Sequence, residues 1–201
     1  MAITSIKTGS SFTNLKKYND FLAGNSAYSP TAYESIATVT VGSGGSASIT
    51  FSSIPATYTH LQLRCSMQET QAGVDWDNFN AVFNSDTGTN YTRHFLEGNG
   101  ATVTAFGAAS RSKAFIGEVS RSGAGTSVFG INIVDILDYS NTNKHKTVRS
   151  LAGYDYNGGG SVGIFSSAWR DTSAISSIVL TSDSASNFSE YSTFALYGIK
   201  G

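Results

Sequence analysis

The sequence has little of three things that would narrow its function at once: cysteine, charge and long apolar runs. Its 201 residues include one cysteine, Cys65, which excludes an intrachain disulfide and a metal site built from several cysteines. Charged residues make up 13% of the chain, about half of their usual share in soluble domains. Because 13 basic residues nearly balance 14 acidic ones, no net field attracts nucleic acid, and we expect no nucleic-acid partner.

Apolar runs long enough to cross a membrane are also missing, since nowhere do about 18 apolar residues follow one another. The first residues, MAITSIKTGSSFTNLKKY, have neither the apolar stretch nor the small-residue cleavage site of a secretory signal. We therefore expect synthesis in the cytoplasm without a secretion signal and no membrane partner.

Recognisable catalytic and metal-binding motifs are absent as well. The chain has no GxSxG elbow and no P-loop, and its three histidines do not stand at metal-binding spacing. Asp75 and Asp77 lack the further oxygen ligands of an EF-hand calcium loop, so we interpret them as part of a solvated loop with Trp76 packed inward. The sequence therefore predicts no catalytic residue, no cofactor and no metal.

An acid pair for glycoside hydrolysis remains the one catalytic possibility to weigh. Such a pair needs two carboxylates facing each other across a cleft, and a β-sandwich of this size offers pairs of that kind by accident. The available carboxylates are Glu97, Glu118, Asp135, Asp138, Asp155 and Asp171.

What the sequence does contain is period-two alternation of apolar and polar residues, which begins at residue 36 and is typical of strands. The segments are 36–41, 47–51, 59–67, 79–84, 90–98, 113–119, 127–137, 145–156, 161–169, 174–182 and 192–199. We expect two hairpins, one joining 36–41 to 47–51 through GSGGS and one joining 79–84 to 90–98 through SDTG.

In two of these segments the alternation distinguishes the two sides of the strand. Leu61, Leu63 and Met67 share the parity of Cys65, which predicts a buried, inert thiol. In 127–137, the face that carries Ile131 and Ile133 is the more evenly apolar.

Many short strands without a βαβ rhythm predict an all-β protein, an antiparallel β-sandwich or barrel. We prefer a jelly-roll-like sandwich, because about eight core strands in about 165 residues fit two four-stranded sheets. The body then spans 36–201, preceded by an irregular N-terminal arm over 1–35.

The arm contains a weak amphipathic patch, FTNLKKYNDFLAG, that predicts one or two helical turns ended by Gly24. An isolated helix this short needs a surface to order it, so the arm either packs on its own body or docks on a neighbour. The apolar residues that would anchor it are Phe12, Leu15, Tyr18, Phe21 and Leu22.

Aromatic residues near glycines offer a candidate glycan-binding platform, since rings stack on sugar faces. Tyr154 and Tyr156 share one side of a strand end in GYDYNGGG, and Trp169 stands before Arg170 and Asp171. The alternative is that these rings belong to the core or to a subunit interface.

Several stretches resemble a family of small virion-associated proteins of tailed phages of aquatic bacteria, including cyanophages. The stretches are YESIATVTVGSGGSASITFSSIPATYTHLQLR (33–64), FNSDTGTNY (83–91), DILDYSNTNKHKTVRSLAGYDYN (135–157), SAWRDTSAISSIVL (167–180) and FALYGIKG (194–201). The resemblance implies a β-sandwich on the virion surface that forms a homo-oligomer, with a trimer expected, and it carries over no catalytic residue.

Two positions on the virion fit this resemblance. A tail fibre or receptor-binding appendage recognising a host glycan would need a long shaft built from heptads or β repeats, and the sequence has none. A capsid decoration (cement) protein needs a compact body and an arm, and about 30 residues could reach up to roughly 100 Å along a shell. We therefore expect a decoration protein whose partners are itself and the major capsid protein, with a tail position as the alternative.

Overall fold

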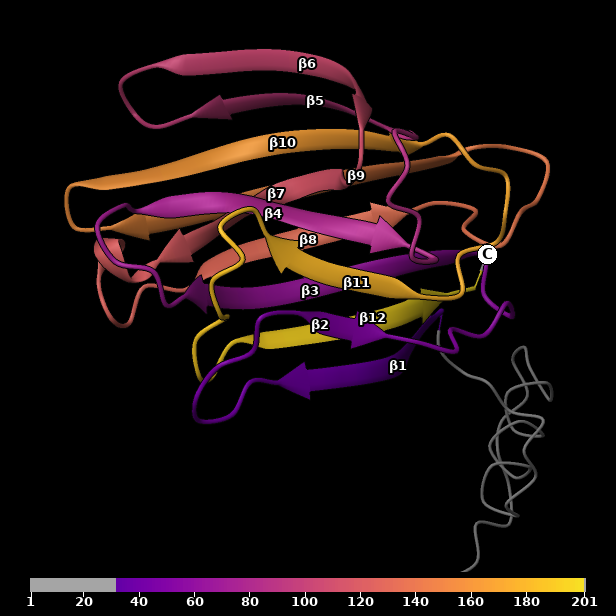
Figure 1. Cartoon of the computed structure of the whole chain (residues 1–201), viewed down its shortest axis with the longest axis horizontal. Helices are drawn as coiled ribbons and strands as arrows, with labels where there is room; N and C mark the ends of the chain where they lie inside the picture. The colour runs from indigo at the N-terminus through magenta and orange to yellow at the C-terminus, as the bar shows by residue number, and fades with distance from the viewer. Residues whose placement is uncertain (1–31, 201) are drawn as a thin grey trace, which may run out of the picture. The chain divides into compact units, whose positions relative to one another are not determined.

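The computed structural model describes residues 32–200, and their regular structure is almost entirely β (Figure 1). The elements are β1 (Tyr33–Thr40), β2 (Ile49–Phe51), β3 (His60–Glu69), β4 (Trp76–Phe83), β5 (Tyr91–Gly98), β6 (Val103–Arg111), β7 (Ala114–Arg121), the short 3-10 turn η1 (Ser122–Ala124), β8 (Gly130–Ile136), β9 (Lys146–Tyr156), β10 (Gly159–Trp169), β11 (Ile178–Ser182) and β12 (Thr193–Ile199). The proposed anchor, Phe12, Leu15, Tyr18, Phe21 and Leu22, lies outside the described residues. Since β1 begins at Tyr33, the last residues of the predicted arm, 33–35, belong to a strand.

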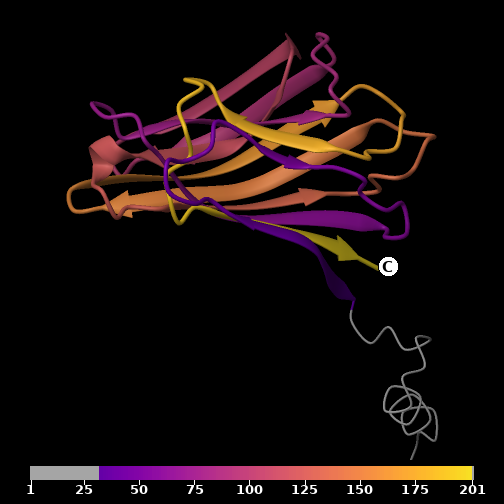
Figure 2. The ribbon, with the colours of Figure 1, turned by 60° about the horizontal axis from the view of Figure 1, so that its bottom comes forward.

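The strands form two layers, which Figure 2 shows one above the other. The long sheet has the order β1-β12-β3-β8-β9-β10-β5-β6, and the short sheet has the order β2-β11-β4-β7. Neighbours within each sheet pair antiparallel. The two sheets join at one corner, where the ends of β3 and β7 pair parallel through Gln68–Ser120 and Glu69–Arg121.

Eight of the strands follow the order of a jelly roll. Counted from first to eighth, they are β2, β3, β4, β5, β6, β7, β10 and β11. In the short sheet the neighbouring strands are then the first, eighth, third and sixth. In the long sheet they are the second, seventh, fourth and fifth, and the β8–β9 hairpin lies in the sheet between the second and the seventh. The predicted antiparallel, jelly-roll-like sandwich is therefore confirmed, with β12 and β1 extending the long sheet beyond β3.

Both predicted hairpins are wrong, for one topological reason. Segment 36–41 falls in β1, which pairs with β12, while 47–51 falls in β2, which pairs with β11. Likewise β4 pairs with β7 and β11, whereas β5 pairs with β6 and β10. In a jelly roll these successive strands cross from one sheet to the other, so a turn-like sequence between them does not make them neighbours.

The space between the sheets is filled by aromatic and aliphatic side chains. Phe188 packs edge-on against Phe79 and Phe194, with ring centroids 6.1 Å and 4.9 Å apart. On β3, Leu61, Leu63, Cys65 and Met67 all point into this core. The predicted burial of Cys65 is confirmed, and burial raises the pKa of its thiol, which keeps it protonated.

Strand β7 lies so close to the long sheet that polar side chains of that sheet bind its backbone. The hydroxyls of Ser167 and Ser150 donate to the carbonyls of Phe115 and Ile116, both at 2.7 Å. Asn132 Nδ2 donates to the carbonyl of Glu118, also at 2.7 Å. These buried polar side chains therefore hydrogen-bond backbone carbonyls of β7 across the sandwich.

Candidate functional site

Trp169, which the sequence suggested as a sugar-stacking residue, is a core residue. Its ring is 1% exposed and lies 5.7 Å from Phe83 and 6.4 Å from Tyr91, measured between ring centroids. Its indole N–H donates to Oδ2 of Asp86 at 2.7 Å, which lowers the pKa of that carboxyl group. A ring packed in this way offers no face to a sugar, so the structure corrects the glycan-contact role proposed for Trp169.

Tyr154 and Tyr156 lie together, as their shared parity predicted. Their rings are nearly parallel, with 6° between the planes and 6.2 Å between the centroids. Tyr154 is buried, and the Tyr156 hydroxyl donates to Oδ2 of Asp75, which raises the pKa of Tyr156. Of the two rings, Tyr156 is therefore the one that a ligand can reach.

An open groove of about 410 Å³ runs beside this pair. Its lining comes from the β5–β6 turn and the β9–β10 hairpin: Gly98, Asn99, Gly100, Tyr154, Asp155, Tyr156, Gly158, Gly159, Gly160, Ser161 and Val162. The space beside Gly159 is taken by the chain itself, since a Cβ there would lie 2.3 Å from Oη of Tyr156. Gly158, by contrast, faces open space.

Two of the carboxylates noted in the sequence, Glu97 and Glu118, meet between the sheets near this groove. Glu118 is 2% exposed, and burial, a hydrogen bond with Glu97 and the charge of Glu97 raise its pKa to about 8. A retaining glycosidase holds its two carboxyl groups about 5 Å apart across an open cleft, whereas Glu118 is enclosed in the protein interior. The pair is suited to share a proton inside the fold.

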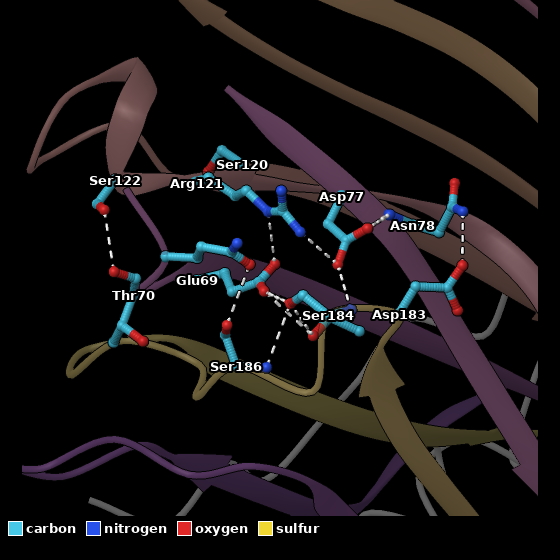
Figure 3. Close-up of polar contacts among 12 residues, drawn as sticks. Glu69, Thr70, Asp77, Asn78, Ser120, Arg121, Ser122, Asp183, Ser184 and Ser186 are labelled. Carbon is cyan, nitrogen blue, oxygen red and sulfur yellow. Dashed lines mark hydrogen bonds and ion pairs between the residues drawn. The ribbon is translucent and has the colours of Figure 1, made fainter. Parts of the chain in front are cut away.

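Asp77, assigned from the sequence to a solvated loop, belongs to a buried ion cluster at the corner where the sheets join (Figure 3). Its Oδ2 lies 2.8 Å from Nη2 of Arg121 and 2.7 Å from the backbone N of Ser184. Nε of Arg121 lies 3.3 Å from Oε2 of Glu69, a fully buried residue whose other carboxylate oxygen accepts from the Ser184 hydroxyl. Trp76 next to it, expected to pack inward, is 40% exposed. The cluster therefore fastens the corner.

A second hollow, of about 200 Å³, has three cations among its seven lining residues. Arg93, Arg111 and Lys113 border it together with Asp183, whose Oδ1 lies 3.7 Å from Nζ of Lys113. The Arg93 guanidinium lies 5.2 Å from the ring centroid of Phe115, and burial together with the charge of Arg111 lowers its pKa. This arrangement could hold a small anion.

The outer face of the long sheet carries a continuous apolar surface, which we call the aliphatic face. Cross-strand pairing aligns its ten residues in two rows across β8, β9, β10, β5 and β6. The rows are Ile133, Leu151, Ile164, Leu96 and Ala105, and beside it Ile131, Gly153, Val162, Gly98 and Val103. Its seven large side chains are between 38% and 75% exposed. The apolar face noted in segment 127–137 is thus the outer one.

Comparisons with known proteins identify no relative of this chain. No protein-family model matches the sequence, and neither a curated protein nor a solved structure matches it. Within residues 32–200, no helix is long and apolar enough to cross a membrane. The same residues contain no group of three or more His, Cys, Asp or Glu side chains placed to hold a metal ion.

Proposed function

We propose that this chain is a structural protein of a tailed-phage virion that decorates the capsid surface as a homo-oligomer, anchored by the residues that precede β1. The observation that carries the proposal is the aliphatic face. Monomeric proteins rarely leave a contiguous apolar area of this extent in water, whereas subunits of assemblies cover one. The jelly-roll body supports it by analogy, since viral capsid domains often have this fold.

On this proposal the partners are further copies of the chain and the major capsid protein. The mechanism is mechanical: each copy buries the apolar residues of its arm against shell subunits, while the bodies hold one another. Several weak contacts then act together through their high effective concentration, so a shell resists pressure better than one contact would allow. No catalytic step is assigned to the chain.

The arm gives the first prediction. A chain lacking residues 1–30 should lose binding to shells assembled from the major capsid protein of the encoding phage, while the circular dichroism of its β body is retained. Replacing Phe12, Leu15, Tyr18, Phe21 and Leu22 by Ser should have the same effect, and replacing Thr13, Asn14 and Asn19 by Ala should not. The measurement is co-sedimentation with the shells. Undiminished binding of the truncated chain would refute an anchoring arm.

The groove beside Tyr154 and Tyr156 supports a second candidate, a tail appendage that binds a host glycan. A partly exposed ring next to Asp155, Asn99 and Ser161 combines a stacking surface with polar groups that could orient sugar hydroxyls. Jelly rolls also include lectin domains, so the fold fits this candidate equally well.

This second candidate predicts saturable binding of a glycan from the host surface. Tyr156→Ala should weaken that binding at least tenfold, because it removes the accessible ring. Tyr191→Ala, which removes a tyrosine that is 72% exposed outside the groove, is the matched control. Binding is measured on immobilised host glycans by surface plasmon resonance, and equal affinity of both variants would reject the groove as the site.

A further inference from the structure

The two rows of the aliphatic face differ in relief. In the first row, Ile133, Leu151, Ile164 and Leu96 stand directly beside one another on neighbouring strands. In the second row, large side chains alternate with glycine in the order Ile131, Gly153, Val162, Gly98 and Val103. The face therefore presents a ridge and, next to it, a line of separate projections and gaps.

This relief can match a copy of itself. Neighbouring strands lie about 4.8 Å apart, so successive projections in the second row stand about 10 Å apart with a gap halfway. One of these gaps is part of a groove of about 310 Å³ whose lining includes Leu96, Gly98, Val103, Val162 and Ile164. A facing copy displaced by one strand would set its projections over these gaps.

We propose that a second copy of this chain packs on the aliphatic face, face to face around a twofold axis. The seven large side chains, each roughly half exposed, present on the order of 700 Å² of apolar surface, close to the about 800 Å² that each partner buries in a standard interface. The largest apolar patch on a typical monomer is about 300–600 Å². The inference rests on the proposed function, because it names the surface through which an assembling protein pairs.

Charge around the face is compatible with self-association. None of the ten residues is charged, so no charge has to be buried without a partner. The row that borders Ile133 and Leu151 carries Asp135 and Arg149, whose Oδ2 and Nη2 atoms lie 3.4 Å apart. Since this border holds both signs, it presents no excess of one charge to a second copy.

The test is the mass of the full chain in solution, measured by sedimentation equilibrium over a range of concentrations. The wild type should have twice the mass of one chain. Ile164→Lys, at the centre of the face, should weaken the dimer at least a hundredfold, because it places an ammonium group in an apolar interface. Thr147→Lys is the matched control: it adds the same charge at an exposed position of β9 outside the two rows, and the dimer should persist.

A second variant probes the fit itself. A Cβ added at Gly98 would have no atom closer than 3.9 Å, so Gly98→Val should fold as the wild type does and fill one gap of the face. We expect it to weaken the dimer at least tenfold with unchanged thermal stability of the monomer.

Three results would overturn the inference: a wild-type monomer at all concentrations, an oligomer that Ile164→Lys leaves intact, or a trimer that depends on Ile164. If the wild type is a monomer and Ile164→Lys weakens only its binding to capsid shells, the face belongs to a contact with another protein. Absence of the chain from virions would refute the proposed function instead and leave the dimer untouched.

Discussion

At the scale of single residues, Glu118 is a buried carboxyl group that stays protonated over part of the neutral pH range. Its carboxyl group lies between the sheets beside Glu97, and the pKa of Glu118 is raised to about 8 from an ordinary value of 4.5. Between these two pH values the folded chain holds a proton that the unfolded chain releases. The free energy of unfolding therefore falls as the pH rises through this window and levels off above it.

Glu118→Gln tests this assignment, because glutamine stays neutral at every pH and can still donate to Glu97. The variant should lose less of its unfolding free energy than the wild type between pH 5 and pH 8, by a few kcal/mol. Urea unfolding at several pH values measures it, with Glu190→Gln at an exposed position as the control. Parallel curves for wild type and Glu118→Gln would contradict a proton shared inside the fold.

At the scale of elements, alternation located the strands and, on β3, the buried face. On β8 the pattern misleads a reader who assigns the more apolar side to the core. The inward side carries Gly130 and Asn132, because β7 passes so close that a Cβ on Gly130 would lie 3.3 Å from the backbone N of Ser120. Strand approach across the sandwich is a long-range property, so no local pattern could have predicted it.

The corner where β3 and β7 meet gives an element-scale prediction. Arg121→Met would leave Glu69 charged and fully buried without its cation, which should cost about 3–5 kcal/mol of unfolding free energy. Lys113→Met is the control, since its contact with Asp183 is partly exposed and should be worth about 0–1 kcal/mol. Urea denaturation compares the two, and equal losses would show that the cluster does not fasten the corner.

The ion cluster at this corner could not be predicted from the sequence. Glu69 and Ser184 are 115 residues apart along the chain, and only the folded topology brings them together. The tyrosine pair, by contrast, could be predicted, because its two members stand two residues apart on one strand. Trp169 was misplaced for a related reason: its partner Asp86 lies on a distant turn, so the sequence did not reveal how completely the ring is enclosed.

At the scale of the whole molecule, the aliphatic face depends on the register of five strands. Each strand contributes only one or two of the exposed large residues, and such residues are unremarkable singly. Cross-strand pairing of β8, β9, β10, β5 and β6 aligns them into one exposed apolar surface. We propose an assembling protein because association would cover this exposed apolar surface.

The most direct test of that account is where the chain lies on a virion. On the proposed function a tailed phage encodes the chain, and its particles are labelled with a gold-tagged antibody against residues 33–201 and imaged by electron microscopy. A capsid decoration protein should place many gold particles over the whole head. Label confined to the tail would favour the glycan-binding alternative, and particles that carry no label would contradict a virion role altogether.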